Sequence, residues 1–283
     1  MVTSVNTNVA AMIALQNLTK TNMELQETQG RVSTGLQVAG AKDNSAIYAI
    51  AQNMRSEVRG LVAVGQSLSR AISTVDVAMA AAESISDLLL EMKEKAIAAA
   101  DTSLDADSRS ALNEDFKALR DQITTIVINA EFNGTNMVKA AGTDVNAIAN
   151  GDGTQTVNVA AEDMSVKATA TAASVAIIRF TATSSFASAT AASATLAQVE
   201  TSLDNVNIAL ARLGAGGRQL DIHNVFITKL KDNLTAGIGS LVDADMAVES
   251  AKLQALQVKQ QLGVQSLSIA NRTPQSILGL FQG

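Results

Sequence analysis

Few residues of this chain have the types and spacing that could carry out chemistry, and His223 is the first of them. It is the one histidine in the sequence and follows Asp221 by two positions. Such a pair could bind a metal ion or transfer a proton. A metal site, however, needs several Cys, His, Asp or Glu ligands at suitable spacing, and the chain has no cysteine. We therefore expect His223 to be an ordinary helix residue, and we expect no metal site.

A glycine-rich stretch resembles a phosphate-binding loop superficially. Residues Leu213–Leu220 read LGAGGRQL. A phosphate loop follows a strand and ends in Gly-Lys-Ser/Thr, and this stretch has neither feature. We expect an irregularity in a helix instead.

Acidic residues cluster in LVDADMAVES (Leu241–Ser250), which holds Asp243, Asp245 and Glu249. A calcium loop would need ligands that this segment lacks. Acidic residues just ahead of a helix stabilise its N-terminus through capping and the helix dipole, and we favour that interpretation. Because no nucleophile can be paired with a base anywhere in the sequence, we predict a protein that is not an enzyme and has no cofactor.

Composition favours long helices. The 283 residues are 47% hydrophobic but only 2% aromatic, with a single proline, Pro274, and proline breaks helix interiors. The net charge of −6 argues against a nucleic-acid partner. No apolar run approaches the ~20 residues of a membrane span, and the N-terminus shows no cleavable signal peptide.

Heptad repeats are the strongest physical signal in the sequence. Two tracks run through residues 59–100, and every position in both is apolar. The members are Leu61, Leu68, Val75, Ala82, Leu89 and Ala96 on one track and Val64, Ala71, Ala78, Ile85, Met92 and Ala99 on the other. A repeat of this length predicts a coiled-coil seam on one long helix.

Further helices follow the same rule. Asp101–Ser110 should end the first seam and cap a second helix. Two heptad tracks recur on that helix: Leu112, Leu119 and Ile126 on one, and Phe116, Ile123 and Ala130 on the other. A third seam runs every seven residues from Val199 to Leu241. Its companion track passes through Gly217, Asn224 and Lys231, which we expect to be less buried. The ends of the chain predict two more helices, at roughly 5–32 and 244–267.

The middle of the chain differs from the helical parts. EFNGTNM (Glu131–Met137) contains Asn133-Gly134, a strong tight-turn signal, and GDG (Gly151–Gly153) also predicts a turn. Residues 142–193 are rich in Ala, Thr, Ser and Val and include the alternating stretch Thr156–Val159. We expect short strands there, with a partly ordered low-complexity loop as the alternative.

The predicted fold is mainly α: a long antiparallel helical hairpin or coiled-coil bundle with a small β-containing middle and paired N- and C-termini. We expect three parts. Residues 1–44 with 243–283 form a terminal helical domain, residues 45–141 with 194–242 form a helical rod, and residues 142–193 form a small variable segment.

Six stretches, taken in order, resemble the flagellin family, whose members form the bacterial flagellar filament. They are SVNTNVAAMIALQNL (4–18), RVSTGLQVAGAKDNSAIYAIAQNMRSEVRGL (31–61), EFNG (131–134), LGA (213–215), DADMAVE (243–249) and ANRTPQSILGLF (270–281). The positions that carry these motifs include Ser33, Gly35, Lys42, Asp43, Arg59, Asn133, Gly134, Asp243, Asp245 and Asn271. Only about 142–193 lies outside the match, and flagellins vary most there.

The resemblance implies a subunit that polymerises with other copies of itself. Its terminal helices would pair in antiparallel fashion, line the filament channel and become ordered only on assembly. The residues expected to make these core contacts are Val5, Leu18, Leu25, Val32, Met246, Leu253, Leu256, Ile277, Leu278, Leu280 and Phe281.

The resemblance also implies an extracellular location reached by flagellar type III export without a cleaved signal. The expected partners are an export chaperone, the export apparatus, and hook-junction and cap proteins, with no membrane or nucleic acid. In the segment that an innate flagellin receptor detects, the chain departs from the family at Glu91, Lys93 and Lys95. Reversing charge on a recognition surface predicts weak or absent receptor binding.

Two alternatives remain at this point. A hook–filament junction protein shares the terminal helices but would depart from the Glu-Phe-Asn-Gly and Asp-Ala-Asp-Met-Ala patterns, which are intact here. A coiled-coil adaptor protein would form a discrete dimer or tetramer instead of a polymer.

Overall fold

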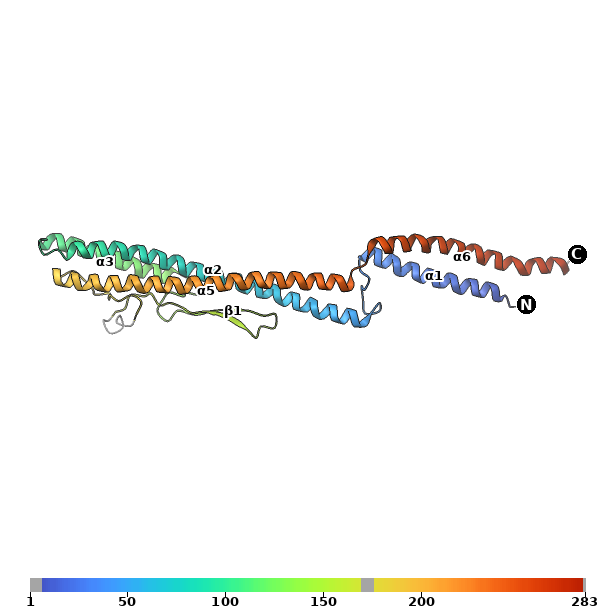
Figure 1. Ribbon diagram of the computed structural model, residues 1–283, viewed down its shortest axis with the longest axis horizontal. Helices are drawn as coiled ribbons and strands as arrows, with labels where there is room; N and C mark the ends of the chain where they lie inside the picture. The colour runs from blue at the N-terminus through green and yellow to red at the C-terminus, as the bar shows by residue number, and fades with distance from the viewer. Residues whose placement is uncertain (1–6, 169–175, 282–283) are drawn as a thin grey trace. The chain divides into compact units, whose positions relative to one another are not determined.

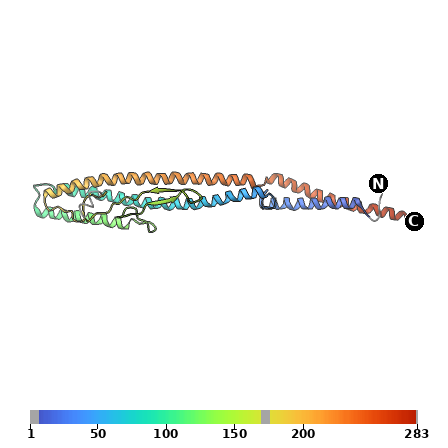
Figure 2. The ribbon, with the colours of Figure 1, turned by 90° about the horizontal axis from the view of Figure 1, so that it is seen from below.

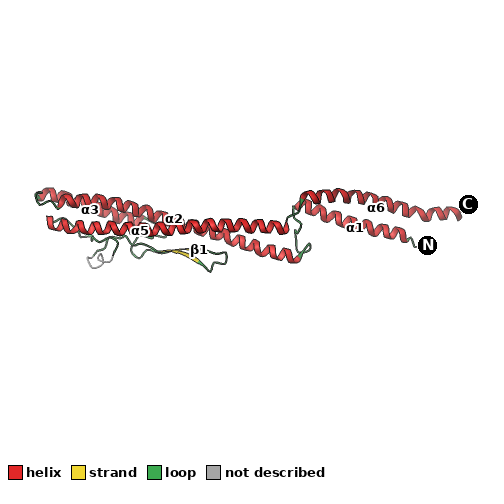
Figure 3. Cartoon of the chain, in the orientation of Figure 1, coloured by secondary structure: helices red, strands yellow, loops and turns green. Residues whose placement is uncertain are grey.

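The fold is built almost entirely from helices, as Figure 3 shows. A computed structural model describes residues 7–168 and 176–281, with backbone alone for 273–281. The elements are, in order, α1 (Val9–Thr34), α2 (Ser45–Ala99), α3 (Ala106–Asn129), β1 (Val145–Ile148), β2 (Thr156–Val159), α5 (Ala189–Val242) and α6 (Met246–Phe281). The helical bundle and the paired termini predicted from the sequence are confirmed.

The chain divides into two compact units. One contains the residues up to Ser56 and those from Asn233 onward, and the other contains Glu57–Asp232. In the first unit, α1 and α6 lie side by side in both views (Figures 1 and 2). In the second, α2, α3 and α5 lie side by side, with the β1–β2 hairpin along them (Figure 1).

The heptad seam of α2 is buried as predicted. All twelve apolar positions of its two tracks are buried, among them Leu68, Ile85, Leu89 and Met92. On α3, Phe116 and Ile123 are buried too. The ring centroid of Phe116 lies 4.4 Å from that of Phe186, which precedes α5.

The seam of α5 departs from the prediction at two places. Leu241 is exposed and Leu234 is only half-buried, whereas Ile238 and Val242 are buried in their stead. A helix has 3.6 residues per turn, so a strict seven-residue spacing drifts off the buried face unless the helix supercoils.

The glycine-rich stretch of α5 is also not an irregularity, because the helix runs through it without interruption. Gly217 is buried instead of more exposed, since a Cβ there would lie 3.5 Å from Cγ1 of Val75. Packing against α2 at ordinary van der Waals distance therefore accounts for the burial of this position. Asn224 and Lys231, further along the same track, are half-buried as expected.

The middle of the chain forms a small antiparallel sheet. β1 and β2 pair with Val145 opposite Val159 and Ile148 opposite Thr156. Buried and exposed residues alternate along both strands, as the pattern at Thr156–Val159 predicted. Ile148 N–H donates to Ser67 Oγ at 3.2 Å, which ties the hairpin to α2.

Candidate self-assembly surface

The pairing of α1 with α6 is antiparallel and is fixed by polar contacts along its length. Asn8 Nδ2 donates to the carbonyl of Ala270 at 2.8 Å, and Gln260 Nε2 donates to Asn22 Oδ1 at 2.8 Å. Near the other end, Arg31 Nη1 lies 3.2 Å from Glu249 Oε1. From Asn8 to Arg31 the residue numbers along α1 increase, while those of the partners in α6 decrease from Ala270 to Glu249. A single antiparallel register therefore joins the two helices.

The ends of both helices are set by the residues that the sequence singled out. Gly35 ends α1 in the left-handed region, at φ 71°, and donates to the carbonyl of Arg31. Only glycine adopts this conformation without strain. Asp245 accepts hydrogen bonds from the N–H groups of Ala247 and Val248 and so caps α6, as predicted for this acidic stretch.

Short backbone contacts join the two segments that lead into this pair. Leu36 and Asp243 form an antiparallel bridge, and Ala244 N–H donates to the carbonyl of Gly35 at 2.9 Å. Asp43 Oδ2 accepts from the N–H groups of Ala39 and Gly40, which closes the turn before α2.

Although α1 and α6 pair closely, their apolar side chains stay largely uncovered. The large apolar residues that remain exposed on these helices are Val9, Met12, Ile13, Leu15, Met23, Met246, Val248, Val258, Leu262, Val264 and Ile269. Met12 is 55% exposed and Leu262 is 58% exposed. Large apolar side chains left exposed in this number make the helix pair a candidate for burial by another protein.

The predicted core-contact residues occupy different environments. Leu256 is buried, Met246 is exposed, and Leu18, Leu25, Val32 and Leu253 are half-buried. Leu18 packs at Gly263, where an added Cβ would lie 3.1 Å from Cδ1 of Leu18. Val5 lies outside the described residues, and the side chains of Ile277, Leu278, Leu280 and Phe281 lie outside the described part of α6.

One polar cluster between α1 and α6 was not anticipated. Thr28 is the buried residue of α1, and Glu249 is also buried. In the described structure, Thr28 Oγ1 and Glu249 Oε2 have no hydrogen-bond partner, while Arg31 joins both Glu249 and Glu27. Buried ionic groups can specify register at a cost in stability.

The other motif residues do not form a single site. Asn133 and Gly134 form the predicted tight turn, with φ values of 49° and 81°, and Phe132 and Thr135 bridge across it. The remaining motif positions are exposed at separate places on the chain: Ser33, Lys42, Arg59 and Asn271.

Sequence analysis missed Asn136, which follows that turn and is buried. Its Nδ2 donates to the carbonyl of Val127 at 2.8 Å, and its Oδ1 accepts from the N–H groups of Val138 and Lys139. The side chain thus satisfies a carbonyl at the end of α3 and holds the chain that leaves it.

The candidate chemical residues take structural roles. His223 is half-buried, and its Nε2 lies 2.8 Å from the carbonyl oxygen of Ala149, in the loop after β1. Within residues 7–168 and 176–281, no group of three His, Cys, Asp or Glu side chains could hold a metal ion. Across the same ranges, none of the helices has the length and apolar character that a membrane crossing requires.

The residues in the receptor segment lie on α2 and contact neighbouring helices. Glu91 is exposed, whereas Lys93 Nζ lies 3.0 Å from Glu200 Oε1 and Lys95 Nζ lies 3.1 Å from Asp115 Oδ2. The hydrogen bond and attraction to Asp115 raise the pKa of Lys95, and Glu94 and Glu91 raise it further. Both cations are therefore engaged with carboxylates of α5 and α3.

Comparison with known families bears directly on this geometry. Models for the bacterial flagellin N-terminal and C-terminal helical regions match residues 5–143 and 196–281. The chain belongs to the bacterial flagellin family. The flagellin FljM of Caulobacter vibrioides is 48% identical over 279 residues, which cover 99% of this chain and 98% of the relative. The flagellin of Brucella melitensis is 38% identical over 286 residues and 99% of both chains.

A solved structure supports the fold alone. A putative flagellar hook-associated protein from Vibrio parahaemolyticus aligns with a TM-score of 0.54 at 16% identity, covering 71% of this chain and all of that one. Flagellins are structural proteins that polymerise into the extracellular flagellar filament for motility. This flagellin is therefore a structural subunit of that filament, as the resemblance implied.

Proposed function

We propose that this flagellin polymerises through the uncovered apolar faces of α1 and α6, which the same helices of neighbouring copies cover. The observation that carries the proposal is the set of exposed apolar residues on a helix pair that is already closely joined by polar contacts. Burial of apolar surface drives association, and many neighbours can together offset the ordering of the chain ends.

The parts of the chain have separate roles in this proposal. Residues 1–44 with 243–283 line the filament channel, residues 45–141 with 194–242 form the surrounding rod layer, and residues 142–193 lie toward the outside. The chain reaches the filament by type III export with a chaperone, meets junction and cap proteins there, and carries no catalytic activity.

Seeded growth tests the proposal. Purified monomer is mixed with short filament fragments and imaged by electron microscopy, beside a chain truncated before Ser276. We expect long filaments from the intact chain and none from the truncated one. Small discrete oligomers from the intact chain, under conditions that polymerise another flagellin, would favour a junction or adaptor protein.

A matched pair of point variants separates apolar burial from a general effect of charge. Ile13 and Gln16 are both exposed on α1. Ile13→Asp should slow elongation more than Gln16→Asp, because only the first change removes apolar surface. Equal rates for the two variants would contradict a role for the apolar face.

We also propose that the innate flagellin receptor detects this chain weakly or not at all. Glu91 presents a negative charge, and Lys93 and Lys95 are engaged by Glu200 and Asp115. Purified monomer should activate receptor-expressing cells far less than a flagellin with arginines in this segment. Glu91→Arg should raise the response, and strong activation by the unchanged chain would contradict the proposal.

A further inference from the structure

Arg179 lies in the stretch between β2 and α5, and its backbone is held firmly in place. Its neighbours Ile178 and Phe180 are fully buried. Its own N–H donates to Oγ of Ser202 on α5 at 2.8 Å. The position of Arg179 is therefore set by backbone and core contacts, without any help from its guanidinium group.

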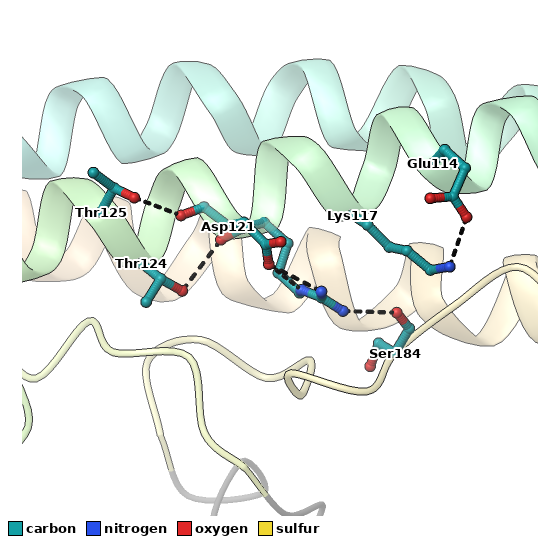
Figure 4. Close-up of polar contacts among 7 residues, drawn as sticks. Glu114, Lys117, Asp121, Thr124, Thr125 and Ser184 are labelled. Carbon is teal, nitrogen blue, oxygen red and sulfur yellow. Dashed lines mark hydrogen bonds and ion pairs between the residues drawn. The ribbon is translucent and has the colours of Figure 1, made fainter.

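That guanidinium group lacks the partners that other arginines of the same unit have. Nε of Arg179 is buried and has no hydrogen-bond partner, and none of the described carboxylates lies within ion-pair distance of the group. Arg109, by contrast, donates to three backbone carbonyls. Arg120 contacts the carboxylate of Asp121 and the carbonyl of Ser184, both labelled in Figure 4. Burying a charged donor without an acceptor is costly, so we looked for a place where an acceptor from outside the chain could bind.

A pocket of about 170 Å³ lies beside this group. Arg179 and Arg212 of α5 both line it, together with Glu162 and Asn205. The side chain of Arg212 is 68% exposed, and its Nη1 lies 3.4 Å from Oε1 of Glu162. Asn205 Nδ2 donates to the carbonyl of Ile177 at 3.1 Å, and the same nitrogen carries a second hydrogen that can donate to a ligand. The pocket thus combines two guanidinium groups with an amide donor.

Carboxylates near the pocket do not cancel its positive charge. Glu162 is the one acidic residue of the lining, so two arginines against one carboxylate leave one positive charge in excess. Asp163, the next residue, is joined to Lys167. Asp204 of α5 is exposed and does not line the pocket. The excess positive charge favours an anion as the ligand.

We propose that this pocket binds one inorganic oxyanion, sulfate or phosphate, between Arg179 and Arg212. Guanidinium groups bind such anions through paired N–H donors. The N–H at Nε of Arg179 is unused, and Arg212 keeps most of its donors because it makes only one long contact with Glu162. A tetrahedral dianion offers four oxygens, enough for both arginines and Asn205, whereas acetate offers two. The bound ion joins the segment before α5 to α5 itself and stabilises the folded chain by mass action.

Equilibrium dialysis of the monomer against radiolabelled sulfate tests the proposal. Tris chloride buffer, held at constant ionic strength, supplies no competing oxyanion. We expect one sulfate per chain with a dissociation constant of about 1 mM, and displacement of that sulfate by phosphate. Acetate should compete at least about tenfold more weakly, because it has one charge and two oxygens.

A matched pair of variants separates the pocket from a general effect of charge. Arg179→Gln should weaken sulfate binding at least about tenfold, because it removes a charged donor at the ion. Arg218→Gln removes the same charge from an exposed position of α5 outside the pocket. It should bind sulfate within about twofold of the unchanged chain, since exposed charges at a distance are screened. Thermal unfolding in chloride checks that both variants are folded.

Glu162 provides a test of opposite sign. Glu162→Gln removes a carboxylate that repels the ion and that holds Arg212, so sulfate binding should tighten at least about threefold. Asp204→Asn removes a carboxylate outside the lining and should change the affinity less. A variant that merely folds poorly would not bind more tightly, so this comparison remains informative even if Arg179→Gln is destabilised.

Several outcomes would overturn the proposal. One is the absence of saturable sulfate or phosphate binding up to about 20 mM. Others are equal losses in folded Arg179→Gln and Arg218→Gln, or acetate that binds as tightly as sulfate. All of these measurements use the monomer, so they do not depend on whether or how the chain polymerises.

Discussion

The side chain of Asn8, at the start of α1, donates a hydrogen bond to the carbonyl of Ala270 in α6. Residue 274 is proline, which has no backbone N–H, so the carbonyl of Ala270 loses its usual donor four residues further on. Asn8 Nδ2 supplies a donor to that carbonyl at 2.8 Å. Its Oδ1 meanwhile accepts from the N–H of Ala11 and caps α1. One side chain therefore serves both helices of the terminal pair.

The two roles of Asn8 can be separated by substitution. Asn8→Asp keeps an oxygen that caps α1 but removes the donor to Ala270, and we expect it to weaken the pairing of α1 with α6 by about 1–2 kcal/mol. In a Pro274→Ala background, residue 274 supplies its own donor, so the effect of Asn8→Asp should shrink. The temperature at which filaments dissociate measures this double-mutant cycle. Additive effects would show that the proline and Asn8 are not coupled.

Two glycines of α5 predict opposite effects of the same substitution. A Cβ at Gly216 would lie 2.6 Å from Cγ1 of Val159 on β2, whereas nothing lies within 4 Å of one at Gly214. Gly214→Ala should raise the free energy of unfolding by about 0.5–1 kcal/mol through helix propensity. Gly216→Ala should lower it by about 1–2 kcal/mol through overpacking against a stiff valine. Urea unfolding of the monomer compares the two, and equal shifts would contradict the packing argument.

Much of the fold follows from heptad spacing, because a residue that recurs every seven positions returns to nearly the same helix face. The α2 seam was predicted in full from this rule. The rule fails at Leu241, where drift favours Val242, and at Gly217, where packing against Val75 decides burial. Such local contacts depend on which helix lies opposite. The spacing of residues within one helix does not predict the identity of that neighbouring helix.

The assembly surface was predictable only in outline. The end segments matched a known family, and the helix caps at Gly35 and Asp245 follow from local sequence. Asn136 could not be recognised, because the carbonyl of Val127 that it binds is set by where α3 ends. The pairing of Arg31 with Glu249 depends on the register between two distant helices. Only the tertiary structure shows these partners.

Asn136 should be among the residues least tolerant of change in the Glu57–Asp232 unit. Asn136→Ala removes one donor to Val127 and one acceptor shared by Val138 and Lys139, and it leaves the buried carbonyl of Val127 and the buried N–H of Val138 without these partners. We expect a loss of about 2–4 kcal/mol in the free energy of unfolding. Asn133→Ala, at the exposed turn nearby, is a comparison that tests turn strain alone. Similar losses for the two variants would argue against a special role for Asn136.

Acid should weaken the start of α3. Hydrogen bonds from the hydroxyl and the backbone N–H of Ser108 lower the pKa of Asp105, which caps this helix, below its usual 3.8. A lowered pKa means that the stabilisation is complete above the unfolded value and is lost as the pH falls through the folded one. Asp105→Asn retains a capping oxygen but does not titrate. The difference in thermal stability between the unchanged chain and this variant, measured between about pH 2 and about pH 6, should therefore shrink below about pH 3.8.

Asp152→Asn, at an exposed turn, measures the effect of removing a charge without a cap. If the difference for Asp105→Asn stayed constant over this range, the ionised carboxylate would have no part in holding the helix start.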